Sequence, residues 1–201
     1  MEEKNMKKVL SILLAAMLIL GMLPATALNV FAAGGTFTRV TSVDQITSGG
    51  KFIIVSGSNA MPKTLSSGKF SPSTVTISNN EITVTNDDLV WTIATTTKGI
   101  SLNTGNTGSS YLAYNSSTNF KLQTSSYDWV VAENGTTDTF MITAVNSSTR
   151  GIFYRAGTQN KFGAYATSNL TNAEYSYVAL YKLSEGGNTP AECTHEGTTV
   201  E

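Results

Sequence analysis

The sequence predicts an all-β domain, a barrel-like fold built from three four-stranded units. Two observations support this prediction. Short segments in which apolar and polar residues alternate recur along residues 36–183 and are separated by Gly, Asn and Ser, which is typical of short strands joined by turns. Four such segments appear in the same order three times, at a spacing of about 40 to 48 residues. Because no helical periodicity extends over about ten residues, we expect a repeat architecture or an internally symmetric barrel.

The first unit follows a lead-in at 37–40 and 42–46, where the alternation predicts extended chain. Its apolar segments are 52–55, 60–65, 75–77, 82–84 and 89–93. The first of these is a continuous apolar run between Gly and Ser, which indicates a strand buried on both faces. Pro62 makes the second an edge or a bulge. Asn79-Asn80 between two alternating segments predicts a hairpin with a tight turn.

The second and third units repeat this order. Their segments are 100–102, 111–114, 120–122 and 129–131, and then 140–144, 151–154, 161–165 and 177–181. The predicted opening positions of the three units are Phe52, Ile100 and Phe140, and the predicted closing aromatic residues are Trp91, Trp129 and Tyr177. Both tryptophans are expected in the core, because an apolar residue follows each of them two positions later on the same strand face.

This pattern resembles a β-trefoil of the ricin-lectin or fascin type. The resemblance covers residues 37–183, with units near 38–99, 100–139 and 140–183. Ricin-type lectins carry Gln-x-Trp in the last strand of each unit, whereas this chain has Leu89-Val-Trp91 and Tyr127-Asp-Trp129. The resemblance therefore implies the architecture more than the sugar site of that family. A β-sandwich of eight to ten strands is the alternative fold.

The first 32 residues have the order of a secretory signal peptide. A basic start at Lys7-Lys8 is followed by an uncharged apolar run over 9–23, by Pro24 and by small residues. The run is shorter than the roughly 20 residues of a membrane-spanning helix, so a membrane anchor is the weaker alternative and we expect no stable membrane span. We predict cleavage after Ala32, with Ala27 as second choice, and a secreted domain over 33–184.

The tail at 185–201 differs from the domain in composition. A Gly-, Asn- and Pro-containing linker precedes Cys193 and His195, the only cysteine and histidine of the chain. The tail resembles the opening of Cys/His-bearing repeats that follow adhesion-type modules in Gram-positive surface proteins. This implies an N-terminal part of a longer, secreted bacterial protein, attached to the cell surface through a further C-terminal region. One Cys-x-His supplies two ligands where structural zinc needs four, so we predict no metal and no cofactor.

Composition and charge exclude several classes of function. Without residues 1–32 the chain has 10 basic and 12 acidic groups, so no nucleic-acid partner and no binding to anionic lipid are expected. The predicted domain contains no histidine, which excludes Ser-His-Asp and Cys-His nucleophiles. Phosphate-binding glycine loops are also absent. We therefore predict that the protein is not an enzyme and has no catalytic residues.

Carboxylates and aromatic residues are the remaining candidates. A glycosidase pair would need two convergent carboxylates, and Asp87-Asp88 could contribute to a calcium site. Both are weaker alternatives, because most of the carboxylates fall at strand ends or turns. Sugars bind to exposed aromatic rings flanked by polar groups, although strand alternation also permits core positions for several of these rings. The candidate ligand-binding residues are Asn115, Tyr154, Arg155, Phe162 and Tyr165.

The function predicted from these observations is that of a non-catalytic extracellular module. We expect it to bind carbohydrate or another extracellular polymer, as a monomeric domain within a longer chain. The alternative is a structural or accessory spacer domain of a larger surface protein or secreted enzyme.

Overall fold

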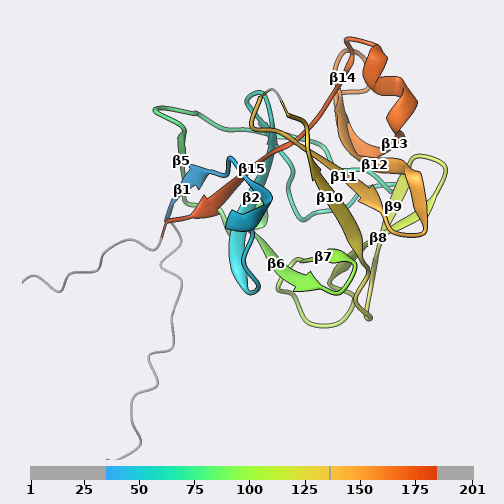
Figure 1. The fold of residues 1–201 in the computed structure, drawn as a ribbon, viewed down its shortest axis with the longest axis horizontal. Coiled ribbons are helices and arrows are strands. Elements are labelled where there is room, and N and C mark those ends of the chain that lie inside the picture. The colour runs from blue at the N-terminus through green and yellow to red at the C-terminus, as the bar shows by residue number, and fades with distance from the viewer. Residues whose placement is uncertain (1–34, 136, 185–201) are drawn as a thin grey trace, which may run out of the picture. The chain divides into compact units, whose positions relative to one another are not determined.

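The computed structural model describes residues 35–135 and 137–184 (Figure 1). Within these residues the chain forms a 15-stranded antiparallel sheet with short 3₁₀ helices and no α-helix, which confirms the all-β class. No helix in this part of the chain has the length and apolar character needed to cross a membrane. The predicted signal peptide at 1–32 and the predicted linker and tail at 185–201 lie outside the described residues.

The strands are β1 (Gly35–Arg39), β2 (Gly50–Ser56), β3 (Asn59–Ala60), β4 (Ser73–Thr74), β5 (Glu81–Val84), β6 (Trp91–Thr96), β7 (Gly99–Asn103), β8 (Tyr111–Ser116), β9 (Asn119–Gln123), β10 (Trp129–Glu133), β11 (Phe140–Ala144), β12 (Ser147–Arg155), β13 (Lys161–Ala166), β14 (Tyr175–Ser176) and β15 (Ala179–Leu183). The 3₁₀ helices are η1 (Val43–Gln45), η2 (Asp87–Leu89) and η3 (Thr167–Thr171).

Six of the strands pair in a ring. The order is β2, β6, β7, β10, β11 and β15, and β15 pairs with β2 again. The link between β11 and β15 is a bridge in which the Phe140 N–H donates to the Val178 carbonyl at 2.7 Å. A closed ring leaves none of these six strands as a free edge.

Three cross-strand pairs occupy equivalent places in this ring. Phe52 faces Trp91, Ile100 faces Trp129 and Phe140 faces Val178. The three predicted opening positions are therefore equivalent, and both tryptophans are fully buried as predicted. The third closing residue was predicted incorrectly. Val178 takes that place, because Tyr177 precedes it by one position and its side chain points to the other face, where its ring packs against Phe153.

Three hairpins extend from the ring, formed by β3–β4, β8–β9 and β12–β13. Backbone hydrogen bonds join them to one another. Phe70 and Phe162 exchange N–H···O bonds of 3.1 and 2.9 Å, the Phe120 N–H donates to the Gly68 carbonyl at 2.8 Å, and the Ala164 N–H donates to the Thr118 carbonyl at 3.0 Å.

The three phenylalanines are buried in one cluster with both tryptophans. The Phe70 and Phe120 rings lie 5.5 Å apart, and each also contacts one of the tryptophans edge-on. Each indole N–H donates to a backbone carbonyl at 2.9 Å, Trp91 to Met61 and Trp129 to Leu112. These bonds satisfy the indole polar groups inside the apolar core.

The first unit departs from the sequence prediction in several places. Of the predicted segments 60–65 and 75–77, only Ala60 lies in a strand, since β3 ends at Ala60 and β4 ends at Thr74. Residues 42–46 do not form a strand, because the Ser42 side chain and Gln45 form a capping box at the start of η1. Asn79 and Asn80 have φ of 52° and 62°, which confirms the tight turn. The strand that follows this turn, however, pairs with β1 along its length, and its link to the preceding segment is a single bridge between Ser78 and Glu81.

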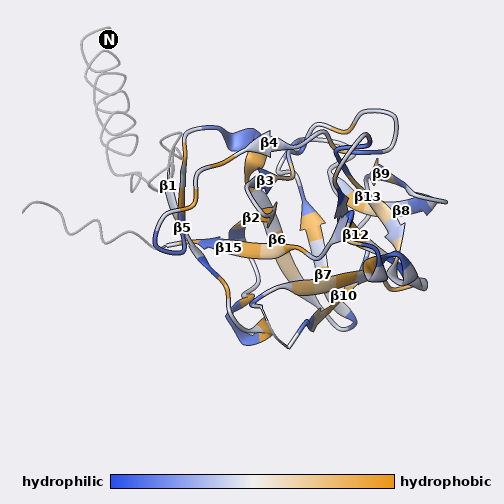
Figure 2. Cartoon of the chain, turned by 90° about the horizontal axis from the view of Figure 1, so that it is seen from above, coloured by the Kyte–Doolittle hydropathy of each residue, from blue (hydrophilic) through white to orange (hydrophobic). Residues whose placement is uncertain are grey.

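The reason for this pairing is a second apolar cluster beside the main core. It combines residues of β1, β2, β5 and β15, including Phe37, Ile53, Ile82 and Tyr181. The strand β2 therefore buries Phe52 and Ile54 in the main core and Ile53 and Val55 in the second cluster, as its continuous apolar run predicts. Figure 2 shows the apolar colour concentrated along the central strands and the hydrophilic colour in the loops.

Candidate functional site

Three clefts lie near β1 and β15. The largest, about 310 Å³, is lined by Thr38, Arg39, Val40, Gln45, Lys182, Leu183 and Ser184. The second, about 260 Å³, is lined by Arg39, Val55, Ser56, Gly57, Ile77, Thr139, Tyr177, Ala179 and Tyr181. The third, about 210 Å³, is lined by Thr41, Glu133, Gly135, Thr137, Asp138 and Thr139. Arg39 lines the first two clefts and Thr139 lines the last two, so the three clefts are neighbours.

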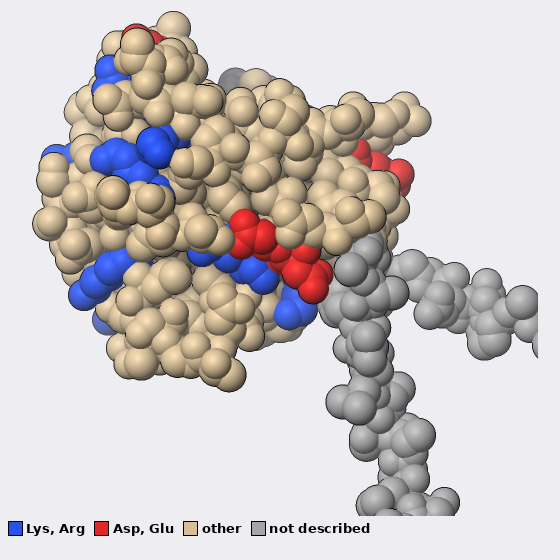
Figure 3. Space-filling model, turned by 180° about the vertical axis from the view of Figure 1, so that it is seen from behind, with Lys and Arg blue, Asp and Glu red and all other residues tan. Residues whose placement is uncertain are grey.

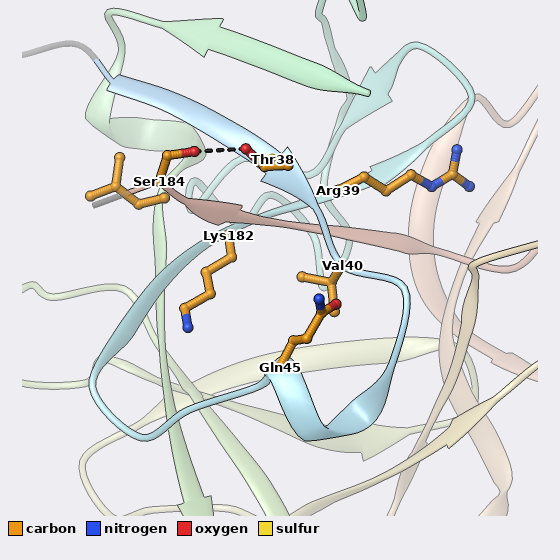
Figure 4. A pocket seen from close by; sticks show the side chains of 7 residues that line it. Thr38, Arg39, Val40, Gln45, Lys182 and Ser184 are labelled. Carbon is orange, nitrogen blue, oxygen red and sulfur yellow. Dashed lines mark hydrogen bonds between the residues drawn. The ribbon is translucent and has the colours of Figure 1, made fainter. Parts of the chain in front are cut away.

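Arg39 is held firmly between these clefts. It stands opposite Tyr181 in the register of β1 and β15. Its Nη2 donates to the Thr137 carbonyl at 2.8 Å and to the Asp138 carbonyl at 3.4 Å. Both bonds come from one nitrogen and go to one loop, so they anchor that end of the guanidinium. In Figure 4 its side chain points away from Lys182 and Gln45.

The 260 Å³ cleft, called the Tyr177 cleft below, has apolar walls and a few polar groups. Val55, Ile77 and the tyrosines supply the walls, and Arg39, Ser56 and Thr139 supply the polar groups. Tyr177 is held by an edge-to-face contact with Phe153, whose ring centroid is 6.1 Å away. This combination of apolar surface and convergent polar groups is typical of small-ligand sites.

Tyr181 and Ile77 line this cleft and differ in their exposure to solvent. Burial raises the pKa of the Tyr181 phenol, and the nearby Arg39 charge partly opposes that rise. Tyr181 is therefore a neutral hydroxyl at the floor of the cleft at physiological pH. Ile77 is 38% exposed, and an apolar side chain this open at a cleft rim is available for contact with a ligand.

The 310 Å³ cleft is more polar than the Tyr177 cleft, and Lys182 is one of its lining residues. The Thr38 and Ser184 hydroxyls are 2.7 Å apart and form a hydrogen bond (Figure 4). The Gln45 side chain is occupied, because its Oε1 accepts hydrogen bonds from Thr41 and from the Ser42 N–H. Lys182 is therefore the main charged group that this cleft offers.

The 210 Å³ cleft contains two carboxylates, Glu133 and Asp138. Glu133 has a structural role, since its Oε1 accepts a 2.7 Å hydrogen bond from the Val43 N–H at the start of η1. Within residues 35–135 and 137–184 no group of three or more His, Cys, Asp or Glu side chains is placed to hold a metal ion. Asp88, considered above for calcium, accepts a 3.0 Å hydrogen bond from the Thr64 hydroxyl.

The residues predicted from the sequence lie on the β8–β9 and β12–β13 hairpins, and none of them lines the three clefts. Tyr154, Phe162 and Tyr165 are buried, so their ring faces are not open to a ligand and the expected stacking surface is absent there. Asn115 is exposed and Arg155 is partly exposed. Their role in ligand binding stays a prediction.

The structure does bring two of these residues close to a common neighbour. The Tyr165 and Tyr175 ring centroids are 5.2 Å apart, and the Arg155 guanidinium lies 5.3 Å from the Tyr175 centroid. Arg155 Nε also donates to Glu174 Oε2 at 3.0 Å. The Tyr154 hydroxyl donates to Asn160 Oδ1 in a different place.

Sequence reasoning missed the residues that shape the Tyr177 cleft. Arg39, Ile77 and Tyr177 are far apart in the chain, and none belongs to a motif. One signal was present, because Tyr177 and Val178 are consecutive in an extended segment and must face opposite sides. With Val178 assigned to the core, Tyr177 would have been predicted on the outer surface.

Neither a protein-family model nor a curated protein sequence matches this chain. Among solved structures, it is similar to the crystal structure of the lysenin pore, with 9% identity and a TM-score of 0.48, covering 74% of this chain and 49% of that one. It is also similar to a complex of lysenin with phosphocholine, with 9% identity and a TM-score of 0.48, covering 69% of this chain and 46% of that one. The chain thus spans about half the length of the lysenin chains that it matches.

Proposed function

We infer that the domain is a β-trefoil. The closed ring of six strands, its three equivalent cross-strand pairs and its three hairpins support this assignment. A β-sandwich would instead place two separate sheets face to face. In the trefoil assignment, β1, β5 and the second apolar cluster are additions outside the ring.

We propose that this domain is a secreted, non-catalytic module that binds carbohydrate or another extracellular polymer in the Tyr177 cleft. The observation that carries the proposal is the combination of Tyr177, Ile77 and Arg39 around one cavity of about 260 Å³. An apolar ring and an aliphatic rim suit the C–H face of a sugar, and a fixed guanidinium suits its hydroxyl oxygens. The cavity is just below the roughly 300 Å³ at which drug-sized pockets begin, so it suits one sugar unit of a longer chain.

The test is a glycan array with the full chain, covering plant, mucin and bacterial cell-wall sugars. The variants are Ile77→Asn and the matched control Val145→Asn, since both side chains are 38% exposed and only Ile77 lines the cleft. We expect Ile77→Asn to weaken binding about tenfold, because about 1.4 kcal/mol of apolar contact is lost. The Val145→Asn control should bind like the unchanged protein.

Other outcomes would redirect the proposal. If no glycan is retained, the binding role is wrong and a structural or accessory spacer takes its place. If Arg155→Ala abolishes binding while Ile77→Asn does not, the ligand binds at the β12–β13 hairpin. Turnover of chromogenic glycosides that is lost on changing one carboxylate would contradict the non-catalytic assignment.

A further inference from the structure

The outer face of the β12–β13 hairpin gathers positive charge. Arg155 on β12 stands directly opposite Lys161 on β13, and like charges at such positions destabilise a sheet. Lys69, from the first unit, lies beside this face with its Nζ 5.8 Å from the centroid of the Tyr165 ring. Figure 3 shows several Lys and Arg side chains close together on one side of the back of the molecule, with little acidic surface among them.

The two lysines of this face have neutral partners. Lys69 Nζ donates to Thr118 Oγ1 at 2.8 Å and to Asn119 Oδ1 at 3.2 Å. Lys161 Nζ donates to Ser71 Oγ at 2.9 Å. Burial lowers the pKa of Lys69, and repulsion from Lys161 lowers it further. Within the described residues neither ammonium forms an ion pair, whereas Arg155 is already neutralised by Glu174.

The neighbouring Tyr165 ring, whose centroid lies 5.8 Å from Lys69 Nζ, is enclosed by the protein. Tyr165 is only 3% exposed, and its hydroxyl has no hydrogen-bond partner in the structure. Leaving such a group unpaired costs about 1–3 kcal/mol. The Tyr165 ring lies against the backbone at Gly163, where an added Cβ would be 2.9 Å from Tyr165 Cζ.

The two ammoniums repel each other and contact only neutral oxygens, so the surface beside them favours a negative group. An anion placed between Lys69 and Lys161 would replace their repulsion with two charge-assisted hydrogen bonds, which are stronger than those to neutral oxygens. Nucleic acid is a poorer fit, because the chain has a near-neutral balance of 13 basic and 14 acidic residues and lacks a broad basic surface.

We propose that this surface, formed by Lys69 and Lys161, binds an anionic substituent of an acidic polysaccharide. The substituent is a sulfate, a phosphate or a carboxylate. The choice of a polysaccharide rests on the proposed function, while the anion site itself is independent of the Tyr177 cleft.

The test measures retention of the full chain on dextran sulfate, on polygalacturonate and on a phosphorylated dextran, with plain dextran as the neutral probe. These arms distinguish sulfate, carboxylate and phosphate. The variant is Lys69→Gln with Lys161→Gln. The control is Lys63→Gln with Lys98→Gln, which removes the same charge, and in which Lys63 is compensated by Asp87 and Asp88. Thermal unfolding of every variant is followed in parallel.

We expect the Lys69/Lys161 variant to bind at least one anionic probe about tenfold more weakly, with unfolding unchanged or shifted to higher temperature because a repulsion is removed. The control should lose no more than about twofold.

Three results would overturn the proposal. They are equal losses in the two double variants, equal retention on plain dextran, and no retention on any anionic probe. If the double variant unfolds, the single change Lys161→Gln decides the outcome. It removes only the exposed hydrogen bond from Lys161 to Ser71. Ile77→Asn should weaken glycan binding without changing the ratio of retention on the anionic probes to retention on plain dextran, whereas the Lys69/Lys161 variant should lower that ratio. Failure of the Tyr177 cleft and failure of the anion site can therefore be told apart.

Discussion

The hairpins of the second and third units have similar residues on their inner faces and different residues on their outer faces. The register aligns Leu112 with Ile152 and Phe120 with Phe162, and all four side chains are buried in the main core. On the outer side, the positions of Lys121 and Gln123 in the second unit are occupied by Gly163 and Tyr165 in the third.

This difference has a structural cause. In the third unit the chain continues from β13 through η3 and β14, and β14 pairs with β12 and brings Tyr175 over Tyr165. The glycine opposite Phe153 leaves room for the tyrosine ring. Packing in the core thus constrains the residues on the inner face of each hairpin. The residues on the outer face can differ between the units.

The largest effects should be equal in the two hairpins, because the inner faces are equivalent. Phe120→Ala and Phe162→Ala should each lower the free energy of unfolding by about 3–5 kcal/mol, since each leaves a cavity in a closed core. Denaturant unfolding measures both values. A cost below about 1 kcal/mol for either variant would show that its hairpin is not part of the common core.

The next effect should be largest in the third unit, at alkaline pH. Burial raises the pKa of Tyr165 to about 12, with a smaller contribution from Tyr175. Below pH 10 the phenol is neutral in both the folded and unfolded states and stability is unaffected. Between pH 10 and 12 the unfolded chain loses this proton while the folded chain keeps it, so about 2–3 kcal/mol of stability is lost as pH rises.

The matched variant for this effect is Tyr165→Phe. It should reduce the alkaline loss and leave the smaller contributions of Tyr127 and Tyr181, whose pKa values are also raised by burial. Unfolding measured from pH 8 to 12 checks this. An identical pH profile for Tyr165→Phe and the unchanged protein would mean that the Tyr165 phenol is not buried.

A smaller contrast should separate the equivalent outer positions Gly163 and Lys121. Gly163→Ala should cost about 1–2 kcal/mol, because the new methyl group would be 2.9 Å from Tyr165 Cζ and 3.1 Å from the Thr118 carbonyl. Lys121→Ala should change stability by less than about 0.5 kcal/mol, since this side chain is exposed. Equal costs at the two positions would contradict the outer-face difference.

The smallest effect concerns the ion pair of the third unit, between Arg155 and Glu174. Glu174→Gln should lower stability by about 0.2–1 kcal/mol, because the pair is at the surface and screened. Added salt should reduce the difference between the two proteins. Asn115→Ala, at the position aligned with Arg155, should have no measurable effect.

The sequence predicted the features that depend on neighbouring residues. Period-two alternation identified the strands of both regular hairpins and placed Trp91 and Trp129 in the core. The Asn79-Asn80 pair identified a turn, because two consecutive positive φ values favour asparagine. The alternation also showed that Tyr154 could point inward, as it does.

Pairing and convergence depended on contacts distant in the chain. Local alternation does not determine a partner, so it could not show that β5 joins β1 or that Val178 rather than Tyr177 completes the ring. The candidate cleft depends on Arg39 and Tyr177, which are brought together only when β1 and β15 pair.

By itself, the sequence determined the all-β class, the three-fold recurrence and the inner face of most strands, because side-chain direction along a strand follows from local geometry. Only the tertiary structure decided where the candidate binding surfaces lie. Clefts and charge clusters require residues from separate units, and their approach follows from closure of the ring and packing of the core.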